Sequence, residues 1–443
     1  MDFDMLGLAP RLTAALSEQG LTQPTPIQAQ AIPHVMDGRD VMGLAQTGTG
    51  KTAAYGLPML DALLKDGGKA PARGARALVL APTRELVNQI ADSLGAFAGE
   101  GSHLRVLRVV GGVGINPQIK RLEKGAHVLV ATPGRLIDLL DRKAVSLSET
   151  GYLVLDEADQ MLDMGFIHAL RTISKHLPEE RQTLLFSATM PKLMAEIAGS
   201  YLKDPVRVQV APPGKAVEKI DQEVHFVAKA AKGDLLVEML EAHKDERAIV
   251  FGRTKWGMEK LAKQLDRQGF AVAAIHGAKS QGQRERALQG FREGTLKVLV
   301  ATDVAARGLD IPEVRHVYNF ELPNVAENYV HRIGRTARAG ADGRAVAFCA
   351  PDEMGDLKDI EKAMKAAIPV ASGRPWEVEE QPAKKSGGGG RGRRGGGGGG
   401  GRPQGAGGGS KPQGGAGRAG GGGKPGGGLR RGRGGAGRGA KSA

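Results

Sequence analysis

The stretch A-Q-T-G-T-G-K-T, residues 45–52, follows a short apolar run at 41–44 and precedes a segment typical of a helix start. A strand, a glycine-rich turn ending in Gly-Lys-Thr and a helix form a phosphate cradle, because backbone N–H groups and the positive helix end face the anion. We therefore expect a nucleoside triphosphate site made of Gln46, Thr47, Gly48, Thr49, Gly50, Lys51 and Thr52.

Within this loop, Lys51 is expected to reach the outer phosphates, and the Thr52 hydroxyl to bind Mg²⁺. Ala45 stands where the strict pattern has a glycine, so an ordinary glycine-rich turn is the alternative reading of the string alone. The sequence around the loop distinguishes a nucleotide-binding loop from an ordinary turn.

Short apolar runs separated by helical segments continue along the first half of the chain. They lack the alternation of half-exposed strands, which is typical of strands buried on both faces. The predicted strands are 41–44, 77–80, 128–130, 152–155 and 183–186. This order of strands and helices predicts a doubly wound α/β domain with a largely parallel sheet.

Each of these strands leads directly into a polar cluster. Ligands of open parallel sheets bind at the carboxyl edge of the strands, so all the clusters fall where binding is expected. The clusters begin at Gln46, Pro82, Thr132, Asp156 and Ser187.

Paired carboxylates end the fourth of these strands, in L-V-L-D-E-A-D at 153–159. Beside a phosphate loop, Asp156 is expected to bind Mg²⁺, and Glu157 to orient and deprotonate the attacking water. The alternative, an acid-rich helix start, becomes weak once the phosphate loop is considered.

A second α/β domain follows a linker-like stretch, with predicted strands at 248–251, 271–275, 298–301, 314–319 and 345–348. It contains no Gly-Lys-Thr loop. Arg335 and Arg338 lie three residues apart, on one face of an expected helix. They are either a solvated basic face or arginine fingers that reach the γ-phosphate when the two domains close.

Charge is distributed unevenly over the 443 residues, whose formal net charge is +14. From Gln381 onward there are 9 Arg, 5 Lys and no acidic residue, so the first 380 residues are formally neutral. The glycine-rich composition of this tail cannot bury enough surface to fold, and its charge favours phosphate binding over a plain linker.

Cysteine usage and hydropathy limit the cellular compartments expected for the protein. The single cysteine, Cys349, excludes a disulfide within the chain, and the acidic N-terminus lacks the layout of a signal peptide. No apolar run approaches the ~20 residues that span a bilayer. We therefore expect a cytoplasmic protein.

With these motifs in order, the chain resembles the DEAD-box ATP-dependent RNA helicases from Phe3 to Ala350, and its short body and Gly/Arg-rich tail resemble the bacterial RhlE-like group. The resemblance implies that Gln28, in P-T-P-I-Q, binds the adenine edge, with Phe3 as the upstream aromatic. It implies that Asp310 lies at the ATP ribose, and that Asp159, Ser187 and Thr189 couple hydrolysis to domain closure.

The resemblance also implies a set of RNA contacts. They are Pro82, Thr83, Arg84, Gly111, Gly112, Thr132, Pro133, Gly134 and Arg135 in the first domain, and Arg253, Thr254, Gln281, Arg284 and Thr302 in the second. The implied fold is two tandem RecA-like domains, at 1–207 and 219–370, with a linker at 208–218 and a disordered tail at 371–443.

The expected activity is hydrolysis of ATP to ADP and phosphate, with Mg²⁺ as cofactor, used to unwind RNA duplexes or remodel RNA–protein complexes. Contact through the RNA backbone would make binding sequence-tolerant. Ribosomal precursors and the mRNA decay machinery are the expected partners, and no membrane is expected to be involved. A non-unwinding RNA clamp or chaperone and a DNA helicase remain alternatives.

Two positions depart from the family pattern. Leu21 stands where an aromatic residue often stacks on adenine, and Ala337 replaces a common glycine in the last motif. The Ala337 change leaves Arg335 and Arg338 in register.

Overall fold

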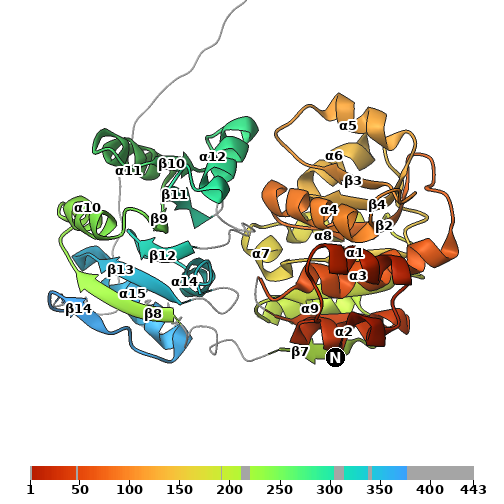
Figure 1. Cartoon of the computed structure of the whole chain (residues 1–443), viewed down its shortest axis with the longest axis horizontal. Helices are drawn as coiled ribbons and strands as arrows, with labels where there is room; N and C mark the ends of the chain where they lie inside the picture. Colours follow the sequence, from red (N-terminus) through yellow and green to blue (C-terminus); the bar gives the residue numbers. More distant parts are fainter. Residues whose placement is uncertain are drawn as a thin grey trace, which may run out of the picture. The chain divides into compact units, whose positions relative to one another are not determined.

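The computed structural model describes residues 2–45, 48–190, 192–210, 220–303, 314–337 and 342–376. By its contacts the chain divides into two compact units, Met1–Glu380 and Gln381–Ala443, and the second lies outside the described residues. The first unit contains two sheets of seven parallel strands each, with helices packed against them (Figure 1). The predicted α/β class with parallel sheets is confirmed.

The first sheet has the strand order β3-β4-β2-β5-β6-β1-β7. Its strands are β1 Val41–Leu44, β2 Ala75–Leu80, β3 Val106–Val109, β4 Ala126–Ala131, β5 Tyr152–Leu155, β6 Gln182–Ser187 and β7 Val206–Gln209. In the register of the sheet, Leu80 pairs with Leu155 and Leu44 with Ser187. The residues that follow β1, β2, β5 and β6 are therefore brought to one edge.

Helices cover both faces of this sheet, because alternate side chains of each buried strand point to opposite faces. One core includes Leu12, Ile90 and Phe186, and the other includes Leu136, Met161 and Ile173. The helical elements are η1 Phe3–Leu6, α1 Pro10–Glu18, α2 Pro26–Met36, α3 Lys51–Asp66, α4 Arg84–Ala98, α5 Ile115–Leu122, α6 Pro133–Asp141, α7 Ala158–Asp163, α8 Ile167–Ser174 and α9 Lys192–Tyr201.

The second sheet has the order β10-β11-β9-β12-β13-β8-β14. Its strands are β8 Ile220–Phe226, β9 Arg247–Gly252, β10 Val272–Ile275, β11 Val298–Thr302, β12 Val314–Asn319, β13 Gly343–Cys349 and β14 Val370–Ser372. The described helical elements are α10 Lys232–Ala242, α11 Lys255–Arg267, α12 Gln281–Glu293, α14 Ala326–Ile333, η3 Pro351–Glu353 and α15 Met354–Met364. Cys349 is buried, and burial raises the pKa of its thiol to about 12, as expected of an unreactive core residue.

The domain boundaries differ slightly from those expected. Strand β7 extends to Gln209, so the first sheet includes two residues assigned to the linker. The expected tail, 371–443, begins on the second domain. Strand β14 belongs to the second sheet, and the indole of Trp376 donates to the Cys349 carbonyl at 3.1 Å. Both strands lie at sheet edges, where a buried apolar run is not required.

No helix in the described part of the chain is long and apolar enough to cross a membrane.

Candidate active site

The glycine-rich loop connects β1 to α3. Gly48 and Gly50 have φ values of +86° and +89°, the left-handed region that favours glycine. A Cβ at Gly50 would lie 2.3 Å from Nε2 of Gln28, so the close approach also requires glycine. Gln46 and Thr47 lie outside the described residues.

Lys51, the first residue of α3, is buried, with 6% of its surface exposed. Among the described residues its Nζ has no hydrogen-bond partner, and it pairs with Asp156 Oδ1 only at 3.9 Å. Burying an ammonium group without hydrogen bonds is costly. The arrangement fits an anionic ligand that would complete the ammonium's coordination.

Asp156 lies at the end of β5 with 2% of its surface exposed. Its Oδ2 accepts from the Tyr55 hydroxyl at 3.0 Å, and its Oδ1 from the Glu157 N–H at 2.9 Å. Burial raises the pKa of Asp156, and the Lys51 charge acts against this shift. Burial, and then the charge of Asp156, also raise the pKa of Tyr55, which therefore keeps its proton as a donor.

Glu157 has a φ of +49°, in the left-handed region that residues with a side chain rarely adopt. It is 2% exposed and precedes α7. Such backbone strain costs of order 1–3 kcal/mol and concentrates at functional sites. The strained turn holds the Glu157 side chain beside Asp156 at the carboxyl edge of the sheet.

Asp159 connects the ends of β5 and β6. Its Oδ2 accepts from the N–H groups of Ala188 and Thr189, at 3.1 and 2.8 Å, and from the Thr189 hydroxyl at 3.0 Å. The Ser187 hydroxyl donates to the Thr189 carbonyl at 2.6 Å. The three residues expected to couple hydrolysis to closure thus form one hydrogen-bonded group.

Gln28 connects α2 to the phosphate loop. Its Oε1 accepts from the Thr25 N–H at 2.8 Å, and its Nε2 donates to the Gly50 carbonyl at 3.0 Å. Phe3 is 5% exposed and packs in the first core, whereas Leu21 is 43% exposed. The adenine contacts expected of Gln28 and Phe3 stay predictions.

A pocket of about 470 Å³ contains many of the expected RNA contacts. It is lined by Pro82, Thr83, Arg84, Gly111, Thr132, Gly134, Arg135 and Arg284, which belong to the expected set, and by Glu85, Asp138, Met164, Phe166, Gly277 and Lys279. The three lining arginines and Lys279 are cationic, which suits an anionic ligand.

Two helices begin at this pocket. Thr83 caps α4 by accepting from the Leu86 N–H at 3.2 Å, and Thr132 precedes Pro133 at the start of α6. Gly112 has a φ of +73°, and a Cβ there would lie 1.8 Å from Nη1 of Arg84. The Gly111–Gly112 pair therefore makes space for the Arg84 guanidinium.

Charged groups from α4 and α12 meet in the same place. Glu85 Oε2 pairs with Arg284 Nη2 at 2.9 Å, and Glu85 Oε1 accepts from Gln281 Nε2 at 3.4 Å. Burial, and then the charge of Arg284, lower the pKa of Arg84. The excess of positive charge is thus only partly balanced by Glu85.

Other described residues that are expected to contact RNA or ATP do not line this pocket. The Arg253 guanidinium donates to the Leu322 carbonyl and to Asp356 Oδ2, both at 2.5 Å, so it is engaged within its own domain. Thr254 caps α11, and Thr302 is buried at the end of β11. Arg335 is 4% exposed. Asp310 and Arg338 lie outside the described residues.

Two residues of the site are absent from the sequence-based expectations. Tyr55 lies one helical turn after Lys51, a spacing that could have indicated it. Both ring nitrogens of His331 are buried without a hydrogen-bond partner among the described residues. Burial lowers the pKa of His331, although the charge of Asp159 opposes this. The nearby Arg332 is a structural residue, because it binds Asp303 through two nitrogens and is 2% exposed.

Two family models match the chain. The DEAD/DEAH box helicase model covers residues 25–197, and the helicase conserved C-terminal domain model covers residues 231–340. The chain is 46% identical over 363 residues to the DEAD-box ATP-dependent RNA helicase CshA of Bacillus cereus, a match that covers 82% of this chain and 68% of the relative. It is 45% identical to the CshA of Streptococcus pneumoniae, covering 87% of this chain and 73% of the relative.

Solved structures agree with these matches. Dbp5 of S. cerevisiae, bound to RNA and ADP BeF3, is 32% identical with a TM-score of 0.74, and the match covers 84% of this chain and 95% of that one. The helicase Mss116, bound to single-stranded RNA and UDP-BeF, is 29% identical with a TM-score of 0.77, covering 85% of this chain and 80% of that one. The chain belongs to the family of DEAD-box ATP-dependent RNA helicases.

Proposed function

We propose that this protein is an RNA-dependent ATPase that locally unwinds RNA duplexes and remodels RNA–protein complexes. The observation that carries the proposal is the buried Lys51 ammonium, which has no hydrogen-bond partner among the described residues and lies 3.9 Å from Asp156. The names of the curated relatives, and the RNA and nucleotide analogues bound in the solved relatives, support the same activity.

ATP is the proposed substrate of the loop at 45–52. The Lys51 ammonium and the N-terminal N–H groups of α3 would hold the outer phosphates. Thr52 and Asp156 offer the oxygen donors that Mg²⁺ prefers, and the ion would neutralise charge on the phosphates. Glu157, held by its strained turn, would orient the attacking water and accept its proton.

The pocket that contains Arg84, Arg135 and Arg284 is the proposed RNA site. Helix N-termini and arginine side chains bind phosphate without reading base identity, so binding would be sequence-tolerant. A duplex strand that must bend to fit the site would be released, which gives local strand separation.

Arg335 and Arg338 would complete the ATP site from the second domain, and Asp310 would contact the ribose. ATP and RNA then both favour the closed arrangement of the domains, so each raises the affinity for the other. The hydrogen-bonded group of Asp159, Ser187 and Thr189 would transmit this coupling.

Three finer assignments belong to the proposal. The short body and the Gly/Arg-rich tail favour the RhlE-like group within the family. The cytoplasm is the proposed location, and Mg²⁺ the proposed cofactor. Structured RNAs such as ribosomal precursors, or targets of the mRNA decay machinery, are the proposed partners.

Glu157→Gln tests the proposal, because the amide keeps the shape of the side chain but cannot accept a proton from water. The variant should bind ATP and RNA, fail to hydrolyse ATP, and accumulate as a ternary complex in gel-shift assays. Sequencing the RNA that purifies with it would identify the target. Glu149→Gln, at an exposed position, is the matched control and should hydrolyse ATP normally. Loss of ATP binding in Glu157→Gln would refute the role given to Glu157.

A further inference from the structure

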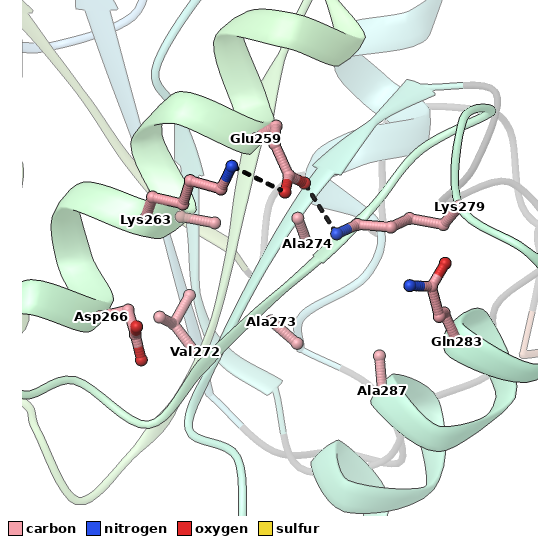
Figure 2. A pocket seen from close by; sticks show the side chains of 10 residues that line it. Glu259, Lys263, Asp266, Val272, Ala273, Ala274, Lys279, Gln283 and Ala287 are labelled. Carbon is pink, nitrogen blue, oxygen red and sulfur yellow. Dashed lines mark ion pairs between the residues drawn. The ribbon is translucent and has the colours of Figure 1, made fainter.

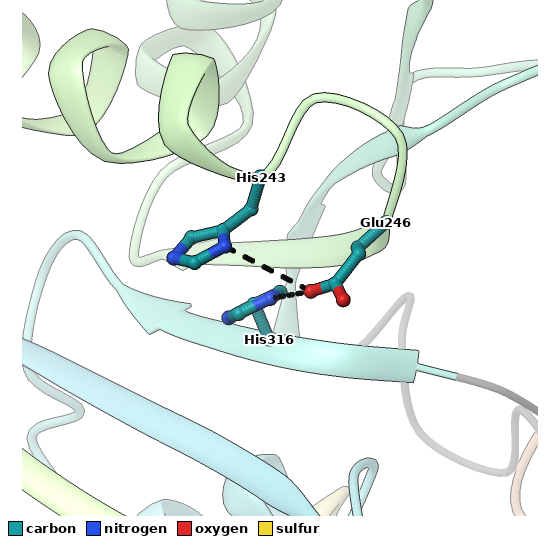
Figure 3. Close-up of side chains that lie close together, drawn as sticks. All are labelled: His243, Glu246 and His316. Carbon is teal, nitrogen blue, oxygen red and sulfur yellow. Dashed lines mark hydrogen bonds and ion pairs between the residues drawn. The ribbon is translucent and has the colours of Figure 1, made fainter.

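Two histidines and a glutamate converge in the second domain, away from the proposed active site (Figure 3). His243 directly follows α10, Glu246 lies in the turn that leads to β9, and His316 lies near the start of β12. His316 pairs with Ala248 of β9 in the sheet. The cluster therefore lies at the amino edge of these strands, opposite the carboxyl edge where the proposed ATP and RNA contacts lie.

The ligand atoms of the three side chains are close together. One nitrogen or oxygen from each lies within 4.8 Å of the other two. His316 Nε2 makes a short hydrogen bond to Glu246 Oε2, and His243 Nδ1 lies 3.9 Å from the same oxygen. The two imidazole rings stack, with their centroids 4.3 Å apart. Among the described residues, these three form the one group of His, Cys, Asp or Glu side chains that lie close enough together to hold a metal ion.

Burial and a hydrogen bond hold the His316 side chain within the cluster. His316 is 6% exposed, and its Nε2 is the ring nitrogen that bonds to Glu246 within the cluster. Metal binding requires a deprotonated imidazole nitrogen and an ionised carboxylate, and this cluster can supply both.

The turn between α10 and β9 leaves the cluster accessible to an ion from solvent. The side chains of His243 and Glu246 are 33% and 47% exposed, so an ion can enter without opening the core. The Glu246 N–H donates to the His243 carbonyl at 2.9 Å, which fixes the turn that holds both ligands. Metal–ligand distances of about 2.0–2.2 Å would place tetrahedral donor atoms about 3.3 Å apart. On metal binding the 3.9 Å separation of His243 and Glu246 would therefore shorten, and the contact between His316 and Glu246 would lengthen.

We propose that His243, Glu246 and His316 form a binding site for a divalent transition-metal ion, with Zn²⁺ as the best fit. Two imidazoles and one carboxylate suit Zn²⁺, whereas Mg²⁺ prefers oxygen ligands in octahedral geometry. Three protein ligands leave a fourth position for water. The ion would replace the hydrogen bond between His316 and Glu246, and would connect the α10–β9 turn to β12.

The test uses the full-length, untagged protein, stripped of metal with a chelator. Zn²⁺ is titrated in competition with a chromophoric chelator, without ATP or RNA. We expect saturable binding whose affinity falls at least about tenfold in His243→Asn and in Glu246→Gln, because each removes one ligand. Co²⁺ is the spectroscopic probe, and its tetrahedral d–d absorption should be lost in both variants. Zn²⁺, but not Mg²⁺, should raise the melting temperature of the wild type.

His103→Asn is the matched control, because His103 is exposed, lies beside His127 and belongs to the first domain. It should bind Zn²⁺ as the wild type does. Both cluster variants change partly exposed side chains, and circular dichroism without metal checks that they fold. The proposal is overturned if the wild type shows no saturable Zn²⁺ binding, or if its affinity survives both substitutions.

Discussion

Lys51 and Asp156 illustrate how buried charges form this site. The pair is almost fully buried, yet 3.9 Å separates the two charged groups, and the Lys51 ammonium has no hydrogen-bond partner among the described residues. Folding would favour a shorter ion pair or an apolar side chain at either position. The arrangement becomes favourable only when a polyanion supplies the missing contacts.

Replacing Lys51 by alanine should therefore weaken ATP binding strongly. A hydrogen bond to a charged group contributes about 1.5–3 kcal/mol, so the affinity for ATP should fall roughly 10–150-fold. A fluorescent ATP analogue measures the change. Lys65→Ala is the matched control in the same helix, because Lys65 is largely exposed and pairs with Asp61. An unchanged affinity in Lys51→Ala would contradict the assignment of the loop.

Ala337 has a φ of +54°, where the family often has glycine. A Cβ in this left-handed region costs roughly 1–2 kcal/mol, so Ala337→Gly should raise the free energy of unfolding by about 1 kcal/mol after the entropy of glycine is counted. Urea unfolding measures it. Ala363→Gly, at an exposed position in α15, should lower the same quantity by about 1 kcal/mol. A loss of stability in Ala337→Gly would show that the strain is absent.

The roles of single residues were predictable to different degrees. The Gly-Lys-Thr loop and the acids after β5 could be placed together because strand ends share one edge of a parallel sheet. Arg253 could not be judged in this way. Its guanidinium donates hydrogen bonds to Leu322 and Asp356. Both are distant in sequence, so no local pattern predicts these contacts.

At the scale of elements, strands buried on both faces were predictable, whereas of the edge strands only β10 was predicted, at 271–275. β2, β4 and β5 contain continuous apolar runs, at 77–80, 128–131 and 152–155, because helices cover both of their faces. β3, β7 and β14 lie at sheet edges and are partly or fully exposed, so their sequences mix polar and apolar residues. The missed strand β8 also carries polar residues, I-D-Q-E-V-H-F.

Helices α11 and α12 flank a pocket of about 280 Å³ that contains a charged cluster (Figure 2). Glu259 accepts from Lys279 at 2.8 Å and from His276 at 3.0 Å, and Lys263 lies 3.7 Å from its other oxygen. The Lys279 and His276 contacts lower the pKa of Glu259 from 4.5 to about 2. The cluster connects α11 to the loop before α12.

A carboxylate with a lowered pKa stabilises the folded state above its unfolded pKa and loses this effect as the pH falls towards its folded pKa. The difference in the free energy of unfolding between wild type and Glu259→Gln should therefore be largest above pH 4.5 and shrink as the pH falls towards 2. Denaturant unfolding at several pH values measures it. Glu238→Gln, at an exposed position in α10, is the control. A difference that is independent of pH would contradict the ion pair.

For the whole molecule, a formally neutral body of 380 residues is joined to a tail with a charge of +14. Phosphate contacts by Lys and Arg release counterions, so their contribution to RNA affinity depends on salt. Removal of residues 387–443 should weaken RNA binding and flatten its salt dependence, while leaving kcat nearly unchanged. Fluorescence anisotropy over a range of salt concentrations measures this. An unchanged salt slope would show that the tail does not contact RNA.

The central claim is that ATP hydrolysis at Lys51, Asp156 and Glu157 depends on RNA bound to the pocket that contains Arg84 and Arg135. The most direct test is the rate of ATP hydrolysis by the full-length protein without nucleic acid, with single-stranded RNA, and with DNA of the same sequence. The account predicts a low basal rate that RNA raises several-fold and DNA does not. An equal rate with RNA and DNA, or no response to RNA, would contradict it.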